Sequence, residues 1–248
     1  MKFIALIPAR YASTRFPGKP LAMMKGKPMI ERVYERVAQV IDDVAVCTDD
    51  DRIANAVKAF GGKVVMTSAD HKSGTDRIAE AYRNLHCDAD VVINVQGDEP
   101  FISRDQLESI IDIFRRDPAT RLATIVRPFD GTRSFSELDD PNTPKVVIDD
   151  KGFALYFSRS VIPYLRGVDK ADWPSHHQYY THVGLYAYAA ETLQEITRLE
   201  RSPLEIAESL EQLRWLQNGY RIATAPTSSP TIGIDTPADL ENALQLLK

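Results

Sequence analysis

Short apolar runs alternate with amphipathic stretches along the first half of the 248-residue chain. The runs have the length of β-strands, and the amphipathic stretches repeat apolar residues at helical spacing. Nearly continuous apolar strands are typical of parallel strands that are buried on both faces. The pattern therefore predicts an α/β fold with a mostly parallel sheet between two layers of helices. The expected strands are Lys2–Ile7, Val44–Cys47, Lys63–Met66, Val91–Val95 and Leu122–Val126, and the expected helices are Met29–Val40, Asp50–Phe60, Thr75–Leu85 and Arg104–Arg115.

The pattern changes near residue 131, where the regular alternation stops. Lys145–Ile148 and Phe153–Phe157 predict a hairpin around Asp149–Gly152, and Val183–Tyr188 predicts another strand. We expect a single domain, residues 1–248, with an inserted lobe at about 131–190 that lies over a bound ligand or forms a subunit contact. The final elements are expected to be a helix at Leu204–Leu216, a strand at Tyr220–Ala225 and a helix at Pro237–Leu247.

The first thirty residues contain six Lys or Arg and no Asp or Glu, although the whole chain has a formal net charge of −5. Here the apolar run Phe3–Ile7 leads into the loop Pro8–Pro20, which carries Arg10, Arg15 and Lys19. A basic loop at the carboxyl end of a first strand is where open α/β sheets bind phosphates. The alternative is a solvated basic loop. The single glycine of the loop argues against a P-loop or a GxGxxG dinucleotide motif.

Two acids are candidate metal ligands. Asp98 follows the expected strand Val91–Val95, at the ligand edge of such a sheet, although it could also be a simple turn residue. Nucleotide-bound Mg²⁺ usually takes one or two carboxylates. Asp235 could be a helix cap, but Thr236 and Asp239 already form a capping pair, which leaves Asp235 for other work.

The loop sequence IPARYASTRFPGKPL (Ile7–Leu21) resembles the opening signature of the CMP-Kdo synthetases, the 3-deoxy-manno-octulosonate cytidylyltransferases. The matching motifs stand in the family's order over nearly the whole chain, so the resemblance is highly specific. The stretch Gly167–Tyr180 has no matching pattern. The further motifs are GKPMI (Gly26–Ile30), SGTDR (Ser73–Arg77), NVQGDEP (Asn94–Pro100), ALYFSR (Ala154–Arg159), HVGLY (His182–Tyr186), SPLE (Ser202–Glu205), LEQLR (Leu210–Arg214) and IDTPADLE (Ile234–Glu241).

The resemblance implies a three-layer nucleotidyltransferase fold with a Rossmann-like sheet. It implies that, with Mg²⁺ present, CTP and Kdo react to form CMP-Kdo and pyrophosphate. This reaction activates Kdo for lipopolysaccharide synthesis. It also implies a cytoplasmic homodimer. Two other functions remain open: a cytidylyltransferase for 8-amino-Kdo or a related sugar acid, and a non-catalytic sensor that binds CTP.

The resemblance also assigns roles to individual residues. Arg10, Lys19, Asp98 and Asp235 are the expected catalytic group, and the two acids are the metal ligands. For several of the other assigned residues, a purely structural role is the alternative. Ser73 could be a helix cap, His182 a strand histidine whose hydrogen bonds are made within the protein, and Glu211 a solvated acid on a helix. The expected nucleotide contacts are Pro8, Ala9, Arg10, Arg15, Lys19, Ser73, Gly74 and Arg77, and the expected sugar-acid contacts are Gln96, Arg159, His182, Tyr186, Glu211 and Gln212.

Composition excludes several other classes of protein. The net acidity argues against nucleic-acid binding, and no apolar run approaches the ~20 residues that a membrane span requires. The chain begins without a signal-peptide pattern and contains two cysteines, Cys47 and Cys87, which favours a reducing cytoplasm. His176 and His177 lack partners at zinc-ligand spacing, so zinc is not expected.

Overall fold

The computed structural model describes residues 1–13, 15–230 and 232–246. The chain divides into two compact units. The first contains residues 1–108, 185–197 and 230–248, and the second contains residues 109–184 and 198–229. Two elements, α4 (Arg104–Arg116) and β10 (Tyr180–Ala189), have residues in both units.

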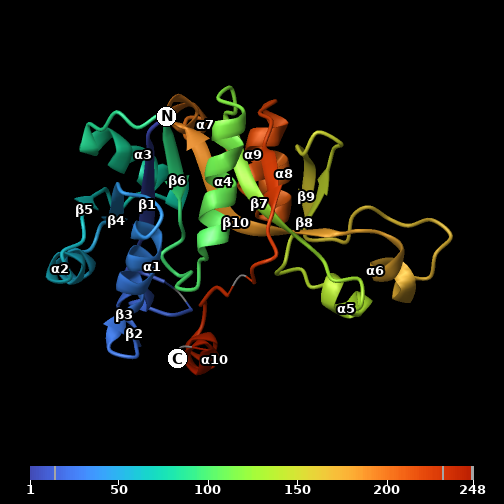
Figure 1. The fold of residues 1–248 in the computed structure, drawn as a ribbon, viewed down its shortest axis with the longest axis horizontal. Helices are drawn as coiled ribbons and strands as arrows, with labels where there is room; N and C mark the ends of the chain where they lie inside the picture. The colour runs from blue at the N-terminus through green and yellow to red at the C-terminus, as the bar shows by residue number, and fades with distance from the viewer. Residues whose placement is uncertain (14, 231, 247–248) are drawn as a thin grey trace. The chain divides into compact units, whose positions relative to one another are not determined.

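The first unit is built on four parallel strands, which lie side by side in the order β5, β4, β1, β6 (Figure 1). Their bounds are β1 Phe3–Ala9, β4 Val44–Thr48, β5 Val64–Met66 and β6 Val91–Asn94, each within two residues of the predicted strand. Residues 186–189 of β10 run antiparallel to β6. Every residue of β4 and β6 is buried, as expected for strands with helices on both faces.

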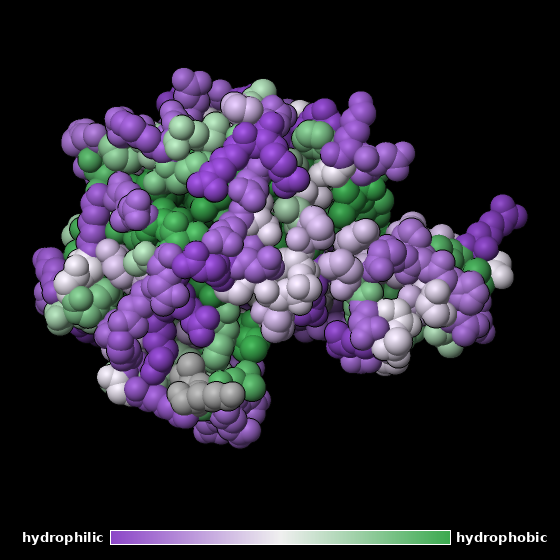
Figure 2. Space-filling model, in the orientation of Figure 1, coloured by the Kyte–Doolittle hydropathy of each residue, from purple (hydrophilic) through white to green (hydrophobic). Residues whose placement is uncertain are grey.

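The helices of this unit follow the predicted amphipathic pattern. In α1, Met29, Ile30, Val33 and Val37 share one face and are fully buried, whereas polar side chains cover the outer face (Figure 2). Gly61, with φ of +80°, follows the end of α2 as a C-terminal cap. The remaining elements of the unit are η1 Lys19–Leu21, β2 Met23–Met24, β3 Lys27–Pro28, α1 Met29–Ala38, α2 Asp51–Ala59, α3 Gly74–Leu85, α7 Ala190–Ile196 and α10 Pro237–Leu246.

The second unit pairs β7 with β11 in parallel and contains the predicted hairpin, β8 with β9. Gly152, with φ of +81°, forms the hairpin turn, and Asp149 accepts hydrogen bonds from the backbone N–H groups of Lys151 and Phe153. The bounds are β7 Leu122–Pro128, α5 Phe135–Leu138, β8 Lys145–Ile148, β9 Ala154–Ser158, η2 Lys170–Asp172, α6 Trp173–His176, α8 Pro203–Glu208, α9 Gln212–Gln217 and β11 Ala223–Pro226.

The expected lobe at 131–190 is divided between the units, because residues 185–190 belong to the first. Its aromatic stretch packs internally: Trp173 and Tyr179 are buried with Phe129 and Leu138. His176 and His177 are exposed. A role of the lobe in acceptor binding or dimerisation stays a prediction. In the described ranges, every helix is too short or too polar to cross a bilayer.

The prediction of one helix at Leu204–Leu216 is wrong, because the structure has two short helices, α8 and α9. Ser209 adopts the left-handed conformation, with φ of +52°, and breaks the chain's helical path. A buried ion pair holds the two helices together. Arg214 donates to both carboxylate oxygens of Glu205, each at 2.8 Å, and the two side chains are 8% and 6% exposed.

We expect Glu205→Leu to destabilise the protein by about 3–5 kcal/mol, because it leaves the buried Arg214 guanidinium without its bidentate partner. Arg201→Leu is the matched control: Arg201 contacts the same carboxylate, but its side chain is 59% exposed, so its loss should cost less than about 1 kcal/mol. Urea denaturation of both variants measures the difference. Equal losses would contradict the importance of the buried pair.

Candidate active site

A polar cavity of about 310 Å³ lies at the carboxyl ends of β1 and β6, and all its lining residues belong to the first unit. All the residues expected to bind the nucleotide or the metal line it, together with Gln96. The structure therefore brings together residues that are up to 227 positions apart in the chain, between Pro8 and Asp235. The lining consists of Pro8, Ala9, Arg10, Ser13, Arg15, Lys19, Pro20, His71, Lys72, Ser73, Gly74, Arg77, Gln96, Gly97, Asp98 and Asp235.

Hydrogen bonds to the backbone of Tyr11 fix the shape of the basic loop after β1. The backbone carbonyl of Tyr11 accepts hydrogen bonds from the N–H groups of Ser13 and Gly18, both at 2.9 Å. Arg52 covers the ring of Tyr11, with Cζ 3.3 Å from the ring centroid. Gly18 has φ of +71°, and a Cβ there would lie 3.0 Å from the ring, so the turn requires glycine. The turn places Lys19 directly after it, at the cavity.

The start of α3 forms another wall of the cavity. Ser73 caps this helix by accepting a hydrogen bond from the N–H of Asp76 at 3.1 Å. The backbone of Gly97 packs closely on β1, because a Cβ there would lie 2.9 Å from the carbonyl oxygen of Pro8. The glycine in the NVQGDEP motif thus lets the ends of β1 and β6 approach each other.

The guanidinium of Arg77 binds other groups of the protein. Its side chain is 5% exposed, and it contacts Asp49 Oδ1 at 3.0 Å, Thr67 Oγ1 at 2.7 Å and the carbonyl oxygen of Ser68 at 3.3 Å. These contacts hold the segment before α3 against the end of β4. Arg77 therefore supports the cavity wall, and its expected direct contact with a nucleotide stays a prediction.

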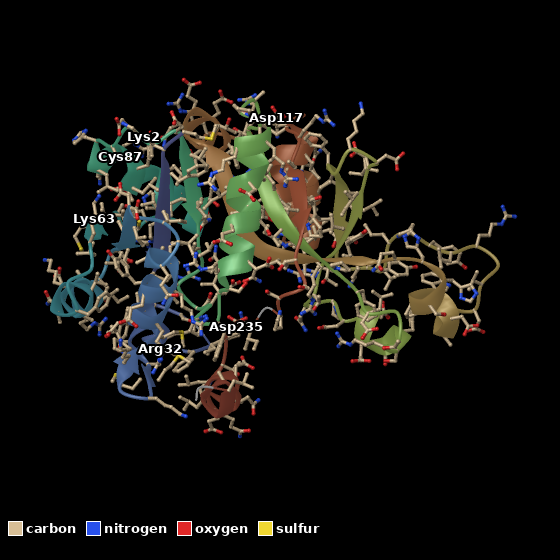
Figure 3. The ribbon with its side chains drawn as sticks, in the orientation of Figure 1. Lys2, Arg32, Lys63, Cys87, Asp117 and Asp235 are labelled. Carbon is tan, nitrogen blue, oxygen red and sulfur yellow. The ribbon has the colours of Figure 1, made fainter. Side chains whose placement is uncertain are left out.

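Hydrophobic packing brings the C-terminal segment to the basic loop. Ile234 and Ala243 are buried against Met24 and Met29, with Phe16, Phe101, Leu240 and Leu244 packed around them. The N–H of Ile234 also donates to the carbonyl oxygen of Asp98 at 3.0 Å. Asp235 consequently lies next to the end of β6, on the segment that leads into α10 (Figure 3).

Lys19 bridges the two expected metal ligands. Its ammonium nitrogen lies 2.5 Å from Asp98 Oδ2 and 3.1 Å from Asp235 Oδ1, and its side chain is 12% exposed. Arg15 contacts the other oxygen of Asp235 at 3.1 Å. The carboxylates of Asp98 and Asp235 are thus close enough to share one cation.

The capping pair predicted beside Asp235 is present. The hydroxyl of Thr236 accepts a hydrogen bond from the N–H of Asp239 at 3.2 Å, and Asp239 accepts from the N–H of Thr236 at 2.8 Å. Because these residues cap α10, the carboxylate of Asp235 is directed to Lys19 and Arg15.

The donor set fits Mg²⁺ better than zinc. Within the described ranges there is no cluster of three or more His, Cys, Asp or Glu side chains that could hold a metal by itself. Two carboxylates beside a cationic loop match an ion that takes its other ligands from phosphate oxygens and water. The neighbouring Glu99 differs from Asp98: burial, and secondly the charge of Asp98, raises the pKa of Glu99 to about 8. Glu99 is therefore largely protonated at neutral pH and adds little negative charge to the site.

The residues expected to bind a sugar acid do not line this cavity, apart from Gln96. Tyr186 belongs to the first unit, where it lies opposite Asn94 on β6 and stacks on Tyr188. Arg159, His182, Glu211 and Gln212 belong to the second unit. Their assignment to a sugar acid stays a prediction.

Within the second unit, Glu208 and the α8–α9 turn hold Arg159. The Arg159 side chain donates to the backbone carbonyls of Glu208 at 2.6 Å, Pro141 at 2.7 Å and Ser209 at 3.3 Å. The carboxylate of Glu208 accepts from the backbone N–H of Arg159 at 2.9 Å and from the hydroxyl of Ser158 at 2.6 Å. The helix break at Ser209 therefore supplies a carbonyl that orients this guanidinium.

His182 is a neutral group at physiological pH, because burial lowers its pKa to about 4. Its Nε2 is 3.1 Å from the hydroxyl of Thr124, and its ring packs edge-on against Phe157. Such an imidazole can hydrogen-bond a sugar hydroxyl but supplies no positive charge to a carboxylate, a role that Arg159 can fill. Gln212 is 4% exposed, and its Nε2 has no hydrogen-bond partner among the described residues, so this donor is available to a ligand.

Sequence reasoning missed several polar residues beside the expected sites. His71 and Lys72 line the cavity, and their position directly before the SGTDR motif is the signal that could have identified them. Glu208 and the buried Lys145, which donates to the carbonyl oxygen of Asp140 at 2.9 Å, lie in the second unit. Both stand outside the resembling motifs, so the sequence offered no comparable signal for them.

Comparisons with known proteins agree with this arrangement. A family model described as cytidylyltransferase matches residues 4–222. The 3-deoxy-manno-octulosonate cytidylyltransferase of Bacteroides thetaiotaomicron is 59% identical over 248 residues, which are 100% of this chain and 99% of that protein. The enzyme of the same name from Porphyromonas gingivalis is 53% identical over 245 residues, which are 99% of this chain and 96% of that protein.

Solved structures show the same fold. The structure of CMP:2-keto-3-deoxy-manno-octonic acid synthetase complexed with CTP matches with a TM-score of 0.91 and 46% identity, over 100% of this chain and 98% of that chain. The structure of a 4-diphosphocytidyl-2C-methyl-D-erythritol synthase from Anaerococcus prevotii matches with 14% identity and a TM-score of 0.62, over 99% of this chain and 98% of that chain. At this identity it shows the fold alone. The predicted nucleotidyltransferase fold is thereby confirmed, and the chain belongs to the 3-deoxy-manno-octulosonate cytidylyltransferase family.

Proposed function

We propose that this protein transfers CMP from CTP to the anomeric C2 hydroxyl of 3-deoxy-D-manno-octulosonate (Kdo), and forms CMP-Kdo and pyrophosphate. The observation that supports this most is the bridge of Lys19 between Asp98 and Asp235, beside a basic loop that follows the first strand. Full-length relatives with 53–59% identity carry the name of this activity.

In the proposed reaction, the C2 oxygen of Kdo forms a bond to the α-phosphorus of CTP. The bond from this phosphorus to the oxygen that bridges to the β-phosphate breaks, and pyrophosphate leaves with the electron pair. The proton of the C2 hydroxyl passes to solvent. Transfer of this kind depends mainly on the positioning of the reactants and on the stabilisation of phosphate charge.

The residues of the basic loop would do most of this work. Arg10, Arg15 and Lys19 would bind the triphosphate and stabilise the charge of the departing pyrophosphate. Asp98 and Asp235 would hold Mg²⁺. When bound, the ion would polarise the α-phosphate and lower the pKa of the attacking hydroxyl. Once triphosphate oxygens bind the ammonium of Lys19 and the guanidinium of Arg15, the two carboxylates would be free to hold the metal.

For the acceptor, we propose that Arg159 binds the carboxylate of Kdo in a charge-assisted pair. Gln96, His182, Tyr186, Glu211 and Gln212 would contact its hydroxyl groups. Neutral His182 and the available amide of Gln212 fit hydroxyl recognition. A cytoplasmic location and a homodimer remain predictions from the family resemblance.

The proposal is tested by measuring pyrophosphate release in the complete reaction, in reactions without Kdo or without Mg²⁺, and in reactions with UTP or ATP in place of CTP. We expect release only with CTP, Kdo and Mg²⁺ together. Faster release with 8-amino-Kdo than with Kdo would identify the alternative acceptor. CTP binding by calorimetry without any pyrophosphate release would support a nucleotide sensor and contradict the proposed reaction.

A further inference from the structure

The cavity wall contains two side chains to which no role has been assigned. His71 and Lys72 line it directly before Ser73 and Gly74, at the start of α3. Most of the cationic side chains that line the cavity, Arg10, Arg15 and Lys19, come from another element, the loop after β1. A nucleoside triphosphate needs cations for its phosphates and, in addition, neutral donors or acceptors for its base. The ring of His71 can supply such a neutral donor or acceptor, and it is held at a fixed place in the wall.

Glu80 of α3 fixes this wall. Its Oε2 contacts Nε2 of His71, and the backbone N–H of Ser68 donates to Oε2 at 3.1 Å and to Oε1 at 3.3 Å. The amide of Asn84 donates to Oε1 at 3.4 Å. The side chains of His71 and Glu80 are only 19% and 23% exposed. One carboxylate thus ties both ends of the segment 68–71 to the helix that follows it.

The charge state of Glu80 suits this role. Burial raises its pKa, but the hydrogen bonds from Ser68 and His71 outweigh burial, so the net pKa lies below the usual value for glutamate. Glu80 is therefore ionised at neutral pH, and an ionised carboxylate only accepts hydrogen bonds. The nitrogen that faces it, Nε2 of His71, must carry a proton. In the neutral ring this leaves Nδ1 as an acceptor.

An acceptor at this place discriminates between pyrimidines. Cytosine carries an amino group at C4, which donates a hydrogen bond, whereas uracil carries a carbonyl oxygen there, which accepts one. A ring nitrogen with a lone pair can accept a hydrogen bond from the amino group of cytosine, and it repels the carbonyl oxygen of uracil. Sites that hydrogen-bond a distinguishing group reject the analogue that lacks it, because their own polar atom is then left unpaired.

We propose that Glu80 is a positioning residue for base selection: it holds His71 with the proton on Nε2, so that Nδ1 accepts a hydrogen bond from the 4-amino group of cytosine. This inference rests on the proposed use of CTP. Glu80 acts through His71, and His71 is the residue that touches the nucleotide. The bonds from Ser68 and Asn84 keep the carboxylate in place before the nucleotide binds.

The test compares kcat and KM for CTP and UTP, with Kdo as acceptor, in Glu80→Ala, His71→Ala and the double variant. We expect Glu80→Ala to raise the KM for CTP by about tenfold, the size of one hydrogen bond to a fixed partner, with kcat nearly unchanged. The preference for CTP over UTP should fall by a similar factor. The double variant should resemble His71→Ala, because the two side chains act as one unit.

Glu80→Gln gives a sharper outcome. Asn84 donates to Oε1 alone, whereas the N–H of Ser68 reaches both oxygens, so the amide oxygen of glutamine should occupy the Oε1 position and its NH₂ group should face His71. Nε2 of His71 must then accept, and the proton moves to Nδ1, which now suits the carbonyl of uracil. We expect Glu80→Gln to favour UTP more than Glu80→Ala does. Glu108→Gln, which changes a helix-surface acid paired with Arg104, is the matched control.

An unchanged ratio of CTP to UTP in both Glu80 variants would overturn the proposal. Additive effects of Glu80→Ala and His71→Ala would do the same, because they would show independent roles. A lower melting temperature together with lower kcat for both nucleotides would reduce Glu80 to a structural residue and also overturn it. If the wild-type protein releases no pyrophosphate from CTP, the proposed function itself fails, and that outcome is visible before any variant is measured.

Discussion

Asp98→Asn should leave the protein folded and reduce pyrophosphate release from CTP by about three orders of magnitude. The substitution removes one of the two carboxylates that meet at Lys19, and with it the negative charge that would hold Mg²⁺. A bound divalent ion contributes several kcal/mol of charge stabilisation in phosphoryl-type transfer, which corresponds to a factor of this size. Steady-state pyrophosphate release and a thermal unfolding curve measure the two effects separately.

Asp88→Asn is the matched control for this prediction. Asp88 precedes β6, whereas Asp98 follows it, so the two acids stand at opposite ends of one strand. The side chain of Asp88 is 82% exposed and pairs with Lys2 at the surface. We expect Asp88→Asn to retain full activity. Normal turnover in Asp98→Asn would refute the assignment of this acid to the metal.

Lys19→Met is expected to have two opposite effects. Turnover should fall by about 100-fold, because the triphosphate loses a preorganised cation. Binding of Mn²⁺ to the nucleotide-free protein should become tighter, because the ammonium no longer competes for Asp98 and Asp235. Titration of Mn²⁺ followed by electron paramagnetic resonance measures this affinity without any turnover.

The exposed Lys27 provides the control, because it also bridges two acids, Glu31 and Glu35, in the same unit. Lys27→Met should change neither turnover nor Mn²⁺ affinity. If Lys19→Met binds Mn²⁺ no more tightly than the wild-type protein does, the bridge of Lys19 does not occupy the metal site. The two carboxylates would then lack the role proposed for them.

The first unit could be predicted well from the sequence, because its signals are local. Continuous apolar runs predicted β1, β4 and β6, and the amphipathic pattern predicted α2 at Asp50–Phe60, close to its observed range Asp51–Ala59. The capping pair of Thr236 and Asp239 was also predictable, since it depends on residues three apart. The cavity was predicted for the same reason: parallel strands bring their carboxyl ends to one edge.

The contacts that complete the cavity could not be predicted. Asp235 reaches Lys19 because Ile234 and Ala243 pack on Met24 and Met29, and such long-range packing leaves no pattern in a single sequence. The two-acid bridge of Lys19 depends on that packing. The break between α8 and α9 was missed because Ser209, in the left-handed conformation, is not a glycine.

Arg77 and His182 show how burial changes the meaning of a motif residue. Sequence reasoning treats an arginine in SGTDR as a free cation, but in the structure Asp49, Thr67 and Ser68 bind its guanidinium. Burial also lowers the pKa of the strand histidine His182 and keeps it neutral. Both properties arise from residues distant in the sequence, so only the fold reveals them.

Asp98 and Asp235 are proposed to hold one divalent ion beside the triphosphate of CTP. Anomalous diffraction from a crystal grown with Mn²⁺ and CTP measures this most directly. We expect a manganese peak within coordination distance of both carboxylates and of a phosphate oxygen, with Lys19 moved from the acids to the triphosphate. A peak that contacts neither acid, with Lys19 still between them while CTP is bound, would contradict this proposal.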